Sequence, residues 1–232
     1  GGGHYHVIST VAADTTAPGI LLDSMGTAEG LILANDRPIF EDALRRGGNQ
    51  QSAFYLDSPR YKLMCGLTTS GGAIEWFRRQ AGNASYDSLI AEAQKLPPGS
   101  NGLCFLPQLR GGDQPYPNPQ ARGAFIGITG DASSGALFRS VLEGLCLSTR
   151  LGLDHLCAIK GVAPISRIRV IGGGTRNELM MKIKASVYGR QLEVTPLSEA
   201  TCLSAAILGG LGAGIFSSVA EAQELMAEGL GQ

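Results

Sequence analysis

The sequence predicts an α/β fold, in which a sheet of strands carries helices packed on its faces. Short apolar runs that end at glycines alternate along the chain with longer segments whose apolar residues recur at helical spacing. Hydrophobic residues make up 44% of the 232 residues, which is enough for a sizeable core. We expect three strands early in the chain, followed by helices that alternate with strands.

The first two strands are predicted to form a pair joined by a tight turn. Apolar residues occupy 20–22 and 31–33, and the segment between them begins Asp-Ser-Met-Gly-Thr at 23–27. A third strand is expected at 61–68. A helix then starts at Ser70-Gly71-Gly72, because the apolar residues that follow have the spacing of a single buried helix face.

The rest of the chain is predicted to alternate between helices and strands. The expected elements are a short helix at 85–95 stopped by Pro97-Pro98, a polar loop at 111–122, a long helix at 133–159, a strand at 167–171, a helix whose capping box is Thr175-Arg176-Asn177-Glu178, a strand at 191–195, an uncharged helix that begins near Ala200, and a final helix capped at 218–221.

Composition excludes several classes of partner. Only 17% of the residues are charged and the net charge is −1, so we expect neither nucleic acid nor an anionic membrane as partner. The five cysteines are odd in number and form no C-x-x-C pair, which favours free thiols in a reducing cytoplasm. No secretory signal is visible, and because the chain starts at Gly1 we expect further residues upstream.

Three further features have simple structural interpretations. The uncharged stretch at 200–220 contains Gly210-x-x-x-Gly214, a membrane dimerisation pattern, but its Gly, Ser and Thr content favours a buried helix that ends at glycines. Cys146 and Cys157 lie more than two turns apart on the long helix, so we interpret both as core residues. His4 and His6 would share one face of a strand, but His155 is distant in sequence, so no metal site is expected.

The strongest local motif is the strand-to-helix turn at 168–177, which contains Gly172-Gly173-Gly174. A strand that stops at glycines and turns into a helix presents free backbone N–H groups that suit a phosphate or the sugar edge of a nucleotide. A plain tight turn explains the pattern equally well. A dinucleotide fingerprint is disfavoured because Asn177 stands where a glycine is needed, and no Walker loop or G-x-S-x-G elbow occurs.

Two other turns are weaker candidates for anion sites. The turn at 23–27 offers backbone N–H groups and the Thr27 hydroxyl, although an ordinary hairpin turn explains it better when it is taken alone. Ser70-Gly71-Gly72 at a helix start is either an anion site or a simple cap.

Taken together, these turns resemble the C-terminal domain of the FGGY carbohydrate kinases over nearly the whole chain. The segment 123–129, continuing through 139–144, resembles the second signature of that family, with Ala136 where a polar residue is usual. Residues 172–177 resemble its adenosine motif, and 23–29 resemble its second phosphate motif. The resemblance implies that 1–14 are a remnant of an inter-domain junction and that 15–232 form the nucleotide-binding domain.

The resemblance also implies a fold, a reaction and a set of site residues. The fold would be actin-like and ribonuclease-H-like, with a mixed sheet and helices on both faces. Gly26 and Thr27 would touch the phosphates of ATP. Gly71 and Glu75 would line the nucleotide cleft. The adenosine would be held by Gly172, Gly173 and Asn177.

The implied reaction is in-line transfer of a phosphoryl group from ATP, with Mg²⁺, to a hydroxyl of a sugar or polyol. Such kinases carry an N-terminal domain that holds most of the sugar site, so this fragment would be inactive without that partner. The resemblance also allows for a homodimer. It places no metal ligand in this chain.

Two departures leave an alternative open. The family often reads Gly-Gly-His-Asp-His at the junction, with the aspartate as catalytic base, whereas this chain has Tyr5 at that position. A phenol is a poor general base at neutral pH. The loop at 110–113 also differs from the usual Gly-Glu-Arg. The alternative is a pseudokinase or sensor that binds nucleotide or sugar without turnover; a Rossmann oxidoreductase is disfavoured by Asn177.

Overall fold

A six-stranded mixed sheet forms the centre of the molecule in the computed structural model, which describes residues 4–55, 59–195, 197 and 199–229. The strand order is β3-β4-β2-β1-β7-β8. β1 pairs antiparallel with β2 and parallel with β7, so both pairing modes occur in one sheet. The strands are β1 Ile20–Met25, β2 Glu29–Asn35, β3 Gln50–Tyr55, β4 Pro59–Leu67, β7 Arg167–Ile171 and β8 Glu193–Val194, with a separate two-stranded sheet of β5 Cys104–Leu106 and β6 Ala124–Ile126.

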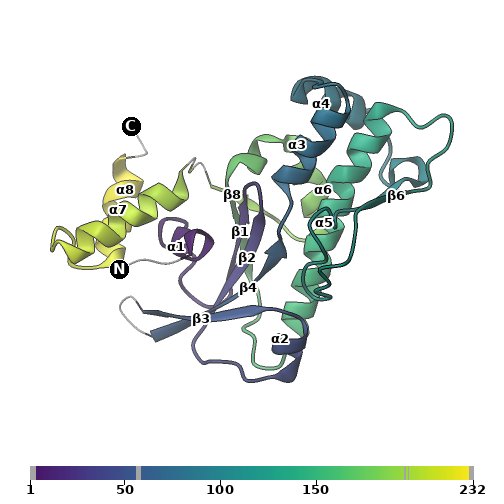
Figure 1. The fold of residues 1–232 in the computed structure, drawn as a ribbon. Helices are drawn as coiled ribbons and strands as arrows, with labels where there is room; N and C mark the ends of the chain where they lie inside the picture. The colour runs from purple at the N-terminus through teal and green to yellow at the C-terminus, as the bar shows by residue number, and fades with distance from the viewer. Residues whose placement is uncertain (1–3, 56–58, 196, 198, 230–232) are drawn as a thin grey trace.

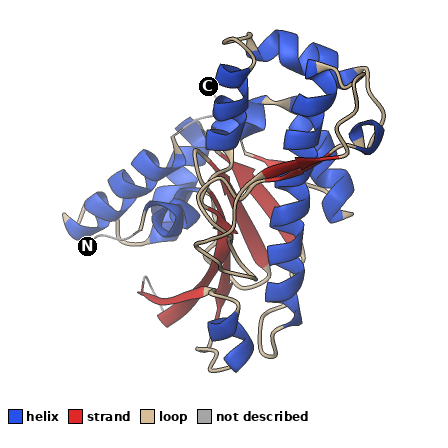
Figure 2. Ribbon diagram, turned by 45° about the vertical axis from the view of Figure 1, so that its right-hand side comes forward, coloured by secondary structure: helices blue, strands red, loops and turns tan. Residues whose placement is uncertain are grey.

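Helices cover both faces of this sheet, as Figures 1 and 2 show, and the predicted mixed α/β architecture is confirmed. One face carries α3, α4, α5 and α6, while α1, α7 and α8 lie on the other. The helices are α1 Tyr5–Ala12, α2 Asp42–Arg46, α3 Gly71–Gln80, α4 Tyr86–Gln94, α5 Ser134–Ala158, α6 Glu178–Tyr188, α7 Ala200–Gly212 and α8 Val219–Gly229, with short 3-10 helices η1 Ser100–Gly102 and η2 Gly173–Arg176.

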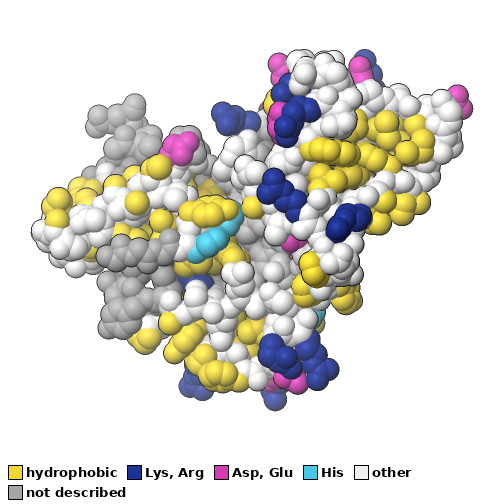
Figure 3. Space-filling view, in the orientation of Figure 1, with side chains coloured by type: hydrophobic (Ala, Val, Ile, Leu, Met, Phe, Trp, Pro, Cys, Tyr) yellow, Lys and Arg dark blue, Asp and Glu magenta, His cyan; other side chains and the backbone are white. Residues whose placement is uncertain are grey.

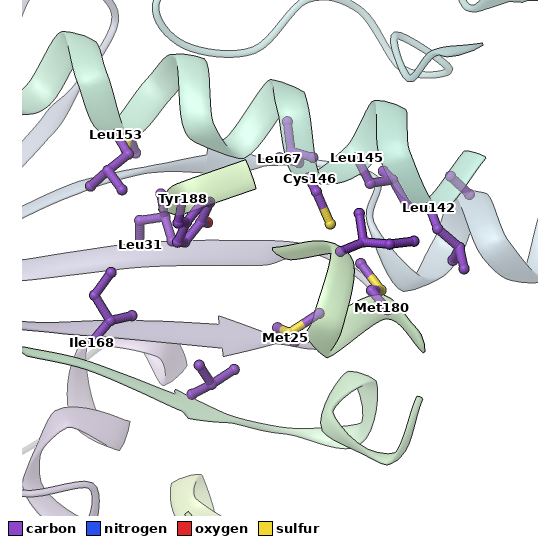
Figure 4. Close-up of a cluster of buried hydrophobic side chains, with 14 of the residues drawn as sticks. Met25, Leu31, Leu67, Leu142, Leu145, Cys146, Leu153, Ile168, Met180 and Tyr188 are labelled. Carbon is purple, nitrogen blue, oxygen red and sulfur yellow. The ribbon is translucent and has the colours of Figure 1, made fainter. Parts of the chain in front are cut away.

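The main core lies between the sheet and α5. Alternate residues of each strand point to opposite faces, so Leu21 of β1 joins the core under α5, while Leu22 joins the smaller core under α1. Figure 4 shows α5 side chains, among them Leu142 and Leu153, directed at the strands. The helix α5, with twenty-five residues, therefore packs along one face of the sheet.

The sequence prediction missed the α1 helix as well as α2, β3, β5 and β6, and it expected three early strands where the structure has four. β3 is an edge strand that reads Gln-Gln-Ser-Ala-Phe-Tyr, and its polar first half lacks the apolar alternation that marks a half-buried strand. The helix α2 has five residues, and β5 and β6 have three residues each. Elements this short are held by their surroundings rather than by local propensity.

The predicted capping box at Thr175 is wrong. The N-cap of α6 is Asn177, whose side-chain oxygen accepts a hydrogen bond from the N–H of Met180. Thr175 instead lies in η2, and its hydroxyl donates to the carbonyl of Gly172 at 2.8 Å. The extra 3-10 turn delays the start of α6 by two residues.

Two assignments of single side chains also need correction. His4 and His6 do not lie on a strand, because His4 caps α1 and His6 is within it. His6 is buried, its Nδ1 lies 2.9 Å from the Ser24 hydroxyl, and burial lowers its pKa to about 4. Cys157, expected in the core, is exposed near the end of α5, whereas Cys146 is buried as predicted.

The uncharged segment after residue 199 forms the predicted helix, but the helix is only half buried. Ser204 and Ile207 face α1 and α8, whereas Cys202, Ala205 and Ala206 are exposed. Its last residue is Gly212, as the glycine pattern predicted. Within the described residues, no helix has the length and apolar character needed to cross a membrane.

Candidate functional site

Three turns from distant parts of the chain meet around one cavity of about 580 Å³. This lies within the range of roughly 300–1,000 Å³ usual for small-ligand sites. β1, β4 and β7 run in the same direction through the sheet, so the turns that follow them come together at one edge. We call this space the nucleotide cavity, by the ligand that the sequence predicts for it. Its lining residues are Met25, Gly26, Thr27, Ser70, Gly71, Ile74, Glu75, Tyr86, Asp87, Ile90, Gly173, Gly174, Arg176, Asn177 and Met180.

Six of the seven predicted binding residues therefore line the same cavity: Gly26, Thr27, Gly71, Glu75, Gly173 and Asn177. Gly172 does not line it. It lies at the end of β7, where a Cβ atom would come within 2.3 Å of the Met25 carbonyl oxygen, and its φ of +98° is one that other residues rarely adopt. Gly172 therefore shapes the turn that presents Gly173 to the cavity.

The start of α3 is docked directly onto the β1–β2 turn. The N–H groups of Ser70 and Gly72 donate to the Thr27 carbonyl at 2.9 and 3.0 Å, and that of Gly71 donates to the Gly26 carbonyl at 3.1 Å. A Cβ atom on Gly71 would come within 2.6 Å of that same carbonyl oxygen, so only glycine allows this approach. Of the two interpretations of Ser70-Gly71-Gly72, the structure supports a cap supplied by the hairpin.

Two of the amides that were expected to face a ligand are already used in hydrogen bonds within the protein. The N–H of Gly26 donates to the Ala28 carbonyl at 2.9 Å, and the N–H of Gly71 is taken as described. The polar surface that these two turns offer to a ligand therefore depends on the Thr27 hydroxyl and on the remaining backbone N–H groups of the β1–β2 turn.

A charged network forms one wall of the nucleotide cavity. Glu75 of α3 accepts two hydrogen bonds from Arg78, at 2.8 and 2.9 Å, and one from the Tyr86 hydroxyl of α4 at 2.6 Å. These hydrogen bonds, from Arg78 first and then Tyr86, lower the pKa of Glu75 to about 2. Glu75 is thus a fixed anion that ties α4 to α3 beside the cavity.

Another part of the cavity lining is apolar. Ile74, Ile90 and Met180 come from three different helices and line it together, with Met25 at the end of β1. Figure 4 shows Met25 and Met180 close to each other at the end of the hydrophobic core. Such a surface suits a planar ring, while the glycine turns suit an anion. Local sequence patterns did not identify these apolar residues, because their role depends on how three helices pack.

Beneath the β1–β2 turn lies a buried ion cluster. The ammonium group of Lys184 on α6 contacts Asp23 Oδ2 at 2.7 Å and also contacts Glu29 Oε1, and all three side chains are fully buried. The Ser70 hydroxyl donates to Glu29 Oε2 at 2.6 Å, and the Tyr188 hydroxyl donates to Asp23 Oδ2 at 3.3 Å. One cation therefore joins two strands and a helix, and through Ser70 the start of α3.

Burial controls the protonation of this cluster. It raises the pKa of the Asp23 carboxyl above its usual range, and the nearby Glu29 carboxylate acts in the same direction, against the lowering effect of Lys184. Burial alone would lower the pKa of Lys184, but Asp23 and Glu29 outweigh it and raise that pKa well above its usual value. Lys184 is therefore a permanent cation at neutral pH.

A second, smaller cavity of about 180 Å³ adjoins the other side of the β1–β2 turn. Thr27 lines the nucleotide cavity, and Ala28, Glu29 and Gly30 line this one. Tyr5, half exposed on α1, also lines it, together with Asp113 of the polar loop. The remaining lining residues are His4, His6, Gln50, Met64, Cys65, Gly66, Leu67, Thr68 and Gln114. We call it the junction cavity.

Asp113 is held at the junction cavity by the residue after β4. Its carboxylate accepts hydrogen bonds from the Thr68 N–H at 3.1 Å and from the Thr68 hydroxyl at 3.4 Å. Partial burial raises the pKa of Asp113, while these two hydrogen bonds oppose the shift. The sequence marked the loop at 110–113 as unusual but did not connect Asp113 with Tyr5, since only the fold brings α1 and this loop together.

The face of the molecule seen in Figure 3 has no continuous basic patch among its described side chains. The described Lys and Arg side chains are scattered there among uncharged and acidic ones. Among the described residues, no group of three or more His, Cys, Asp or Glu side chains is arranged to hold a metal ion.

Two kinases of known function are similar to this chain in amino-acid sequence. Glycerol kinase from Gloeobacter violaceus is 34% identical over 210 residues, which cover 88% of this chain and 41% of the relative. Xylulose kinase from Escherichia coli is 35% identical over 136 residues, or 58% of this chain and 27% of the relative. The chain thus spans about two fifths or less of the length of these curated relatives.

Solved structures share the fold. Glycerol kinase from Plasmodium falciparum with ADP superposes with a TM-score of 0.81 at 22% identity, covering 94% of this chain and 43% of that one. Xylulose kinase from Rhodospirillum rubrum gives a TM-score of 0.76 at 29% identity, covering 96% and 44%. The fold is therefore the actin-like fold of these kinases. Residues 21–213 match the C-terminal domain of the FGGY family of carbohydrate kinases, and the chain belongs to that family.

Proposed function

We propose that this chain is the nucleotide-binding half of a kinase that transfers a phosphoryl group from ATP to a hydroxyl of a sugar or polyol. One observation carries the proposal. The β1–β2 turn separates two cavities, with Thr27 facing the larger and Ala28 to Gly30 facing the smaller. A phosphate held at Thr27 is therefore one residue away from a space open to an acceptor.

The nucleotide would lie across the larger cavity from α6 to the β1–β2 turn. The adenine ring fits the apolar surface of Ile74, Ile90 and Met180, with Gly173 and Asn177 along its sugar edge. The phosphates then extend towards Gly26 and Thr27. A solved structure of the same fold, the Plasmodium falciparum glycerol kinase, is described as containing ADP, which supports a nucleotide as the ligand.

Mg²⁺ fits this site as an ion carried by the phosphates. Magnesium in kinases is commonly held by substrate phosphates and one or two carboxylates rather than by a protein cage. Glu75 is engaged in an ion pair, which leaves Asp87 as the other carboxylate that lines the nucleotide cavity. The ion would supply charge neutralisation as the transferred phosphoryl group moves.

The acceptor hydroxyl would lie in the junction cavity, where Asp113 is our candidate for the group that takes its proton. Glu29 is occupied by Lys184 and Ser70. Burial lowers the pKa of His6 to about 4, and burial raises the pKa of the Cys65 thiol to about 12. Asp113 is a carboxylate at the cavity whose hydrogen bonds come from Thr68 alone among the described residues, and it can act where the phenol of Tyr5 cannot.

The acceptor site would be completed by residues outside this chain. The curated relatives are more than twice as long as the matched region, so we propose an N-terminal domain as the partner that closes the junction cavity. Glycerol and xylulose are the acceptors named for the relatives, and they define the substrate class to test first.

Release of ADP from Mg·ATP by the complete protein tests the proposed function. We expect turnover with at least one of glycerol, D-xylulose and a panel of related polyols, and none without an acceptor beyond slow hydrolysis. The matched variant is Tyr5→Asp. Turnover that is absent from the unaltered protein and present only in Tyr5→Asp would contradict the proposal and show a nucleotide binder without catalysis.

A further inference from the structure

We infer that Lys184 is a positioning residue for the phosphate end of the nucleotide, an inference that rests on the proposed function. Its ammonium group holds both stems of the β1–β2 turn. Asp23 lies three residues before Gly26, and Glu29 lies two residues after Thr27. A single cation thus fixes the two points from which the phosphate turn leaves the sheet.

The same cation connects the turn with the rest of the nucleotide cavity. Glu29 also accepts the hydroxyl of Ser70, and the N–H of Ser70 donates to the Thr27 carbonyl. Lys184 lies one helical turn after Met180 on α6, the helix that Asn177 caps. The β1–β2 turn and the start of α3 are therefore linked to Lys184 directly or through one side chain.

Packing alone does not explain a charged cluster at this place. Burying three ionic groups carries a large desolvation cost, and apolar residues of similar volume often give equal or greater stability. Charge is needed here for a geometric reason, because the carboxylates of Asp23 and Glu29 project from adjacent strands towards the same point. Without a cation between them the two carboxyl groups would repel each other or take up a proton, and the ionic link between the two stems of the turn would be lost.

This arrangement predicts an effect that depends on which part of the nucleotide is present. The apolar surface that would hold adenine comes from the side chains of Ile74, Ile90 and Met180, which make no hydrogen bond or ion pair with the side chains of the ion cluster. The phosphate turn, in contrast, is anchored by that cluster. Loss of Lys184 should therefore weaken binding of ADP far more than binding of adenosine.

Calorimetric titration of the 232-residue chain with Mg·ADP and, separately, with adenosine tests this inference. For Lys184→Met we expect the ADP affinity to fall about 10- to 100-fold, the range found when a group that supports a metal ligand is removed. The adenosine affinity should stay within about threefold. Lys182→Met is the matched control, because Lys182 lies on the same helix, is exposed and forms an ion pair with Glu178 at 3.9 Å. Both affinities should be unchanged.

Two results would overturn the inference while the chain still binds ADP. One is an ADP affinity of Lys184→Met within threefold of the unaltered chain. The other is an equal loss for ADP and adenosine, which would indicate general damage to the fold.

If Lys184→Met does not fold, Glu29→Gln replaces it, because glutamine keeps an acceptor for Ser70 and removes one charge. The same two results, measured for Glu29→Gln, would then overturn the inference. If the unaltered chain binds neither ligand, the proposed function fails and this inference with it.

Discussion

Gly172→Ala is expected to weaken nucleotide binding by at least about tenfold and to destabilise the fold by about 2–4 kcal/mol. The residue has φ +98°, and an added Cβ atom would lie 2.3 Å from the Met25 carbonyl oxygen, so the backbone of the turn must move. Met25 and Gly173 both line the nucleotide cavity, and the movement displaces one against the other. Titration with Mg·ADP and thermal unfolding measure the two effects.

Gly189→Ala is the matched control for that change. Gly189 ends α6 with φ +61°, so it shares the left-handed backbone, but nothing lies within 4 Å of an added Cβ atom. Its replacement should cost about 1 kcal/mol of stability and leave ADP affinity unchanged. Equal ADP affinity in Gly172→Ala and the unaltered chain would show that the turn after β7 does not hold the nucleotide.

Asp113→Asn in the complete protein is expected to lower kcat by about 10²- to 10⁴-fold, the usual contribution of a general base. Asparagine keeps the acceptor for the Thr68 N–H, so the loop at the junction cavity should stay in place. The affinity for Mg·ADP should not change, because Asp113 lines the junction cavity and not the nucleotide cavity. Initial rates at saturating ATP and acceptor give the comparison.

The role of Asp113 as a base also predicts in which direction kcat changes with pH. A carboxylate must be ionised to accept a proton, and burial raises the pKa of Asp113. In the unaltered protein kcat should therefore fall as the pH falls through this raised pKa, and the residual activity of Asp113→Asn should lack that acidic limb. Tyr5→Phe should retain kcat within a few-fold. A full kcat in Asp113→Asn, or its loss in Tyr5→Phe, would exclude Asp113 as the base.

The main strands and helices could be predicted because their apolar patterns are local. β1 and β2 are apolar runs around a glycine turn, and α5 has twenty-five residues with helical spacing. β3 could not be predicted in the same way, since an edge strand needs no apolar alternation on either face. The start of α6 was misplaced because Thr175 and Asn177 both suit an N-cap, and only the extra turn of η2 decides between them.

The candidate site could be predicted in part, because its glycine turns are also local patterns. Glycine turns at 26, 71 and 173 are visible in the sequence, and the direction of β1, β4 and β7 brings them together. The ion cluster joins Asp23 to Lys184, which lies 161 residues later, and no local pattern connects them. The pairing of Tyr5 with Asp113 in one cavity likewise depends on tertiary contacts between a helix and a distant loop.

Amide chemical shifts of the ¹⁵N-labelled chain, followed while Mg·ADP is added, test the central claim most directly. We predict saturable shifts at Gly26, Thr27, Gly173, Gly174 and Asn177, which line one cavity, and no shift at Gly189 or along α8. Shifts that are absent at millimolar nucleotide, or that gather away from these turns, would contradict the assignment of this cavity as the nucleotide site.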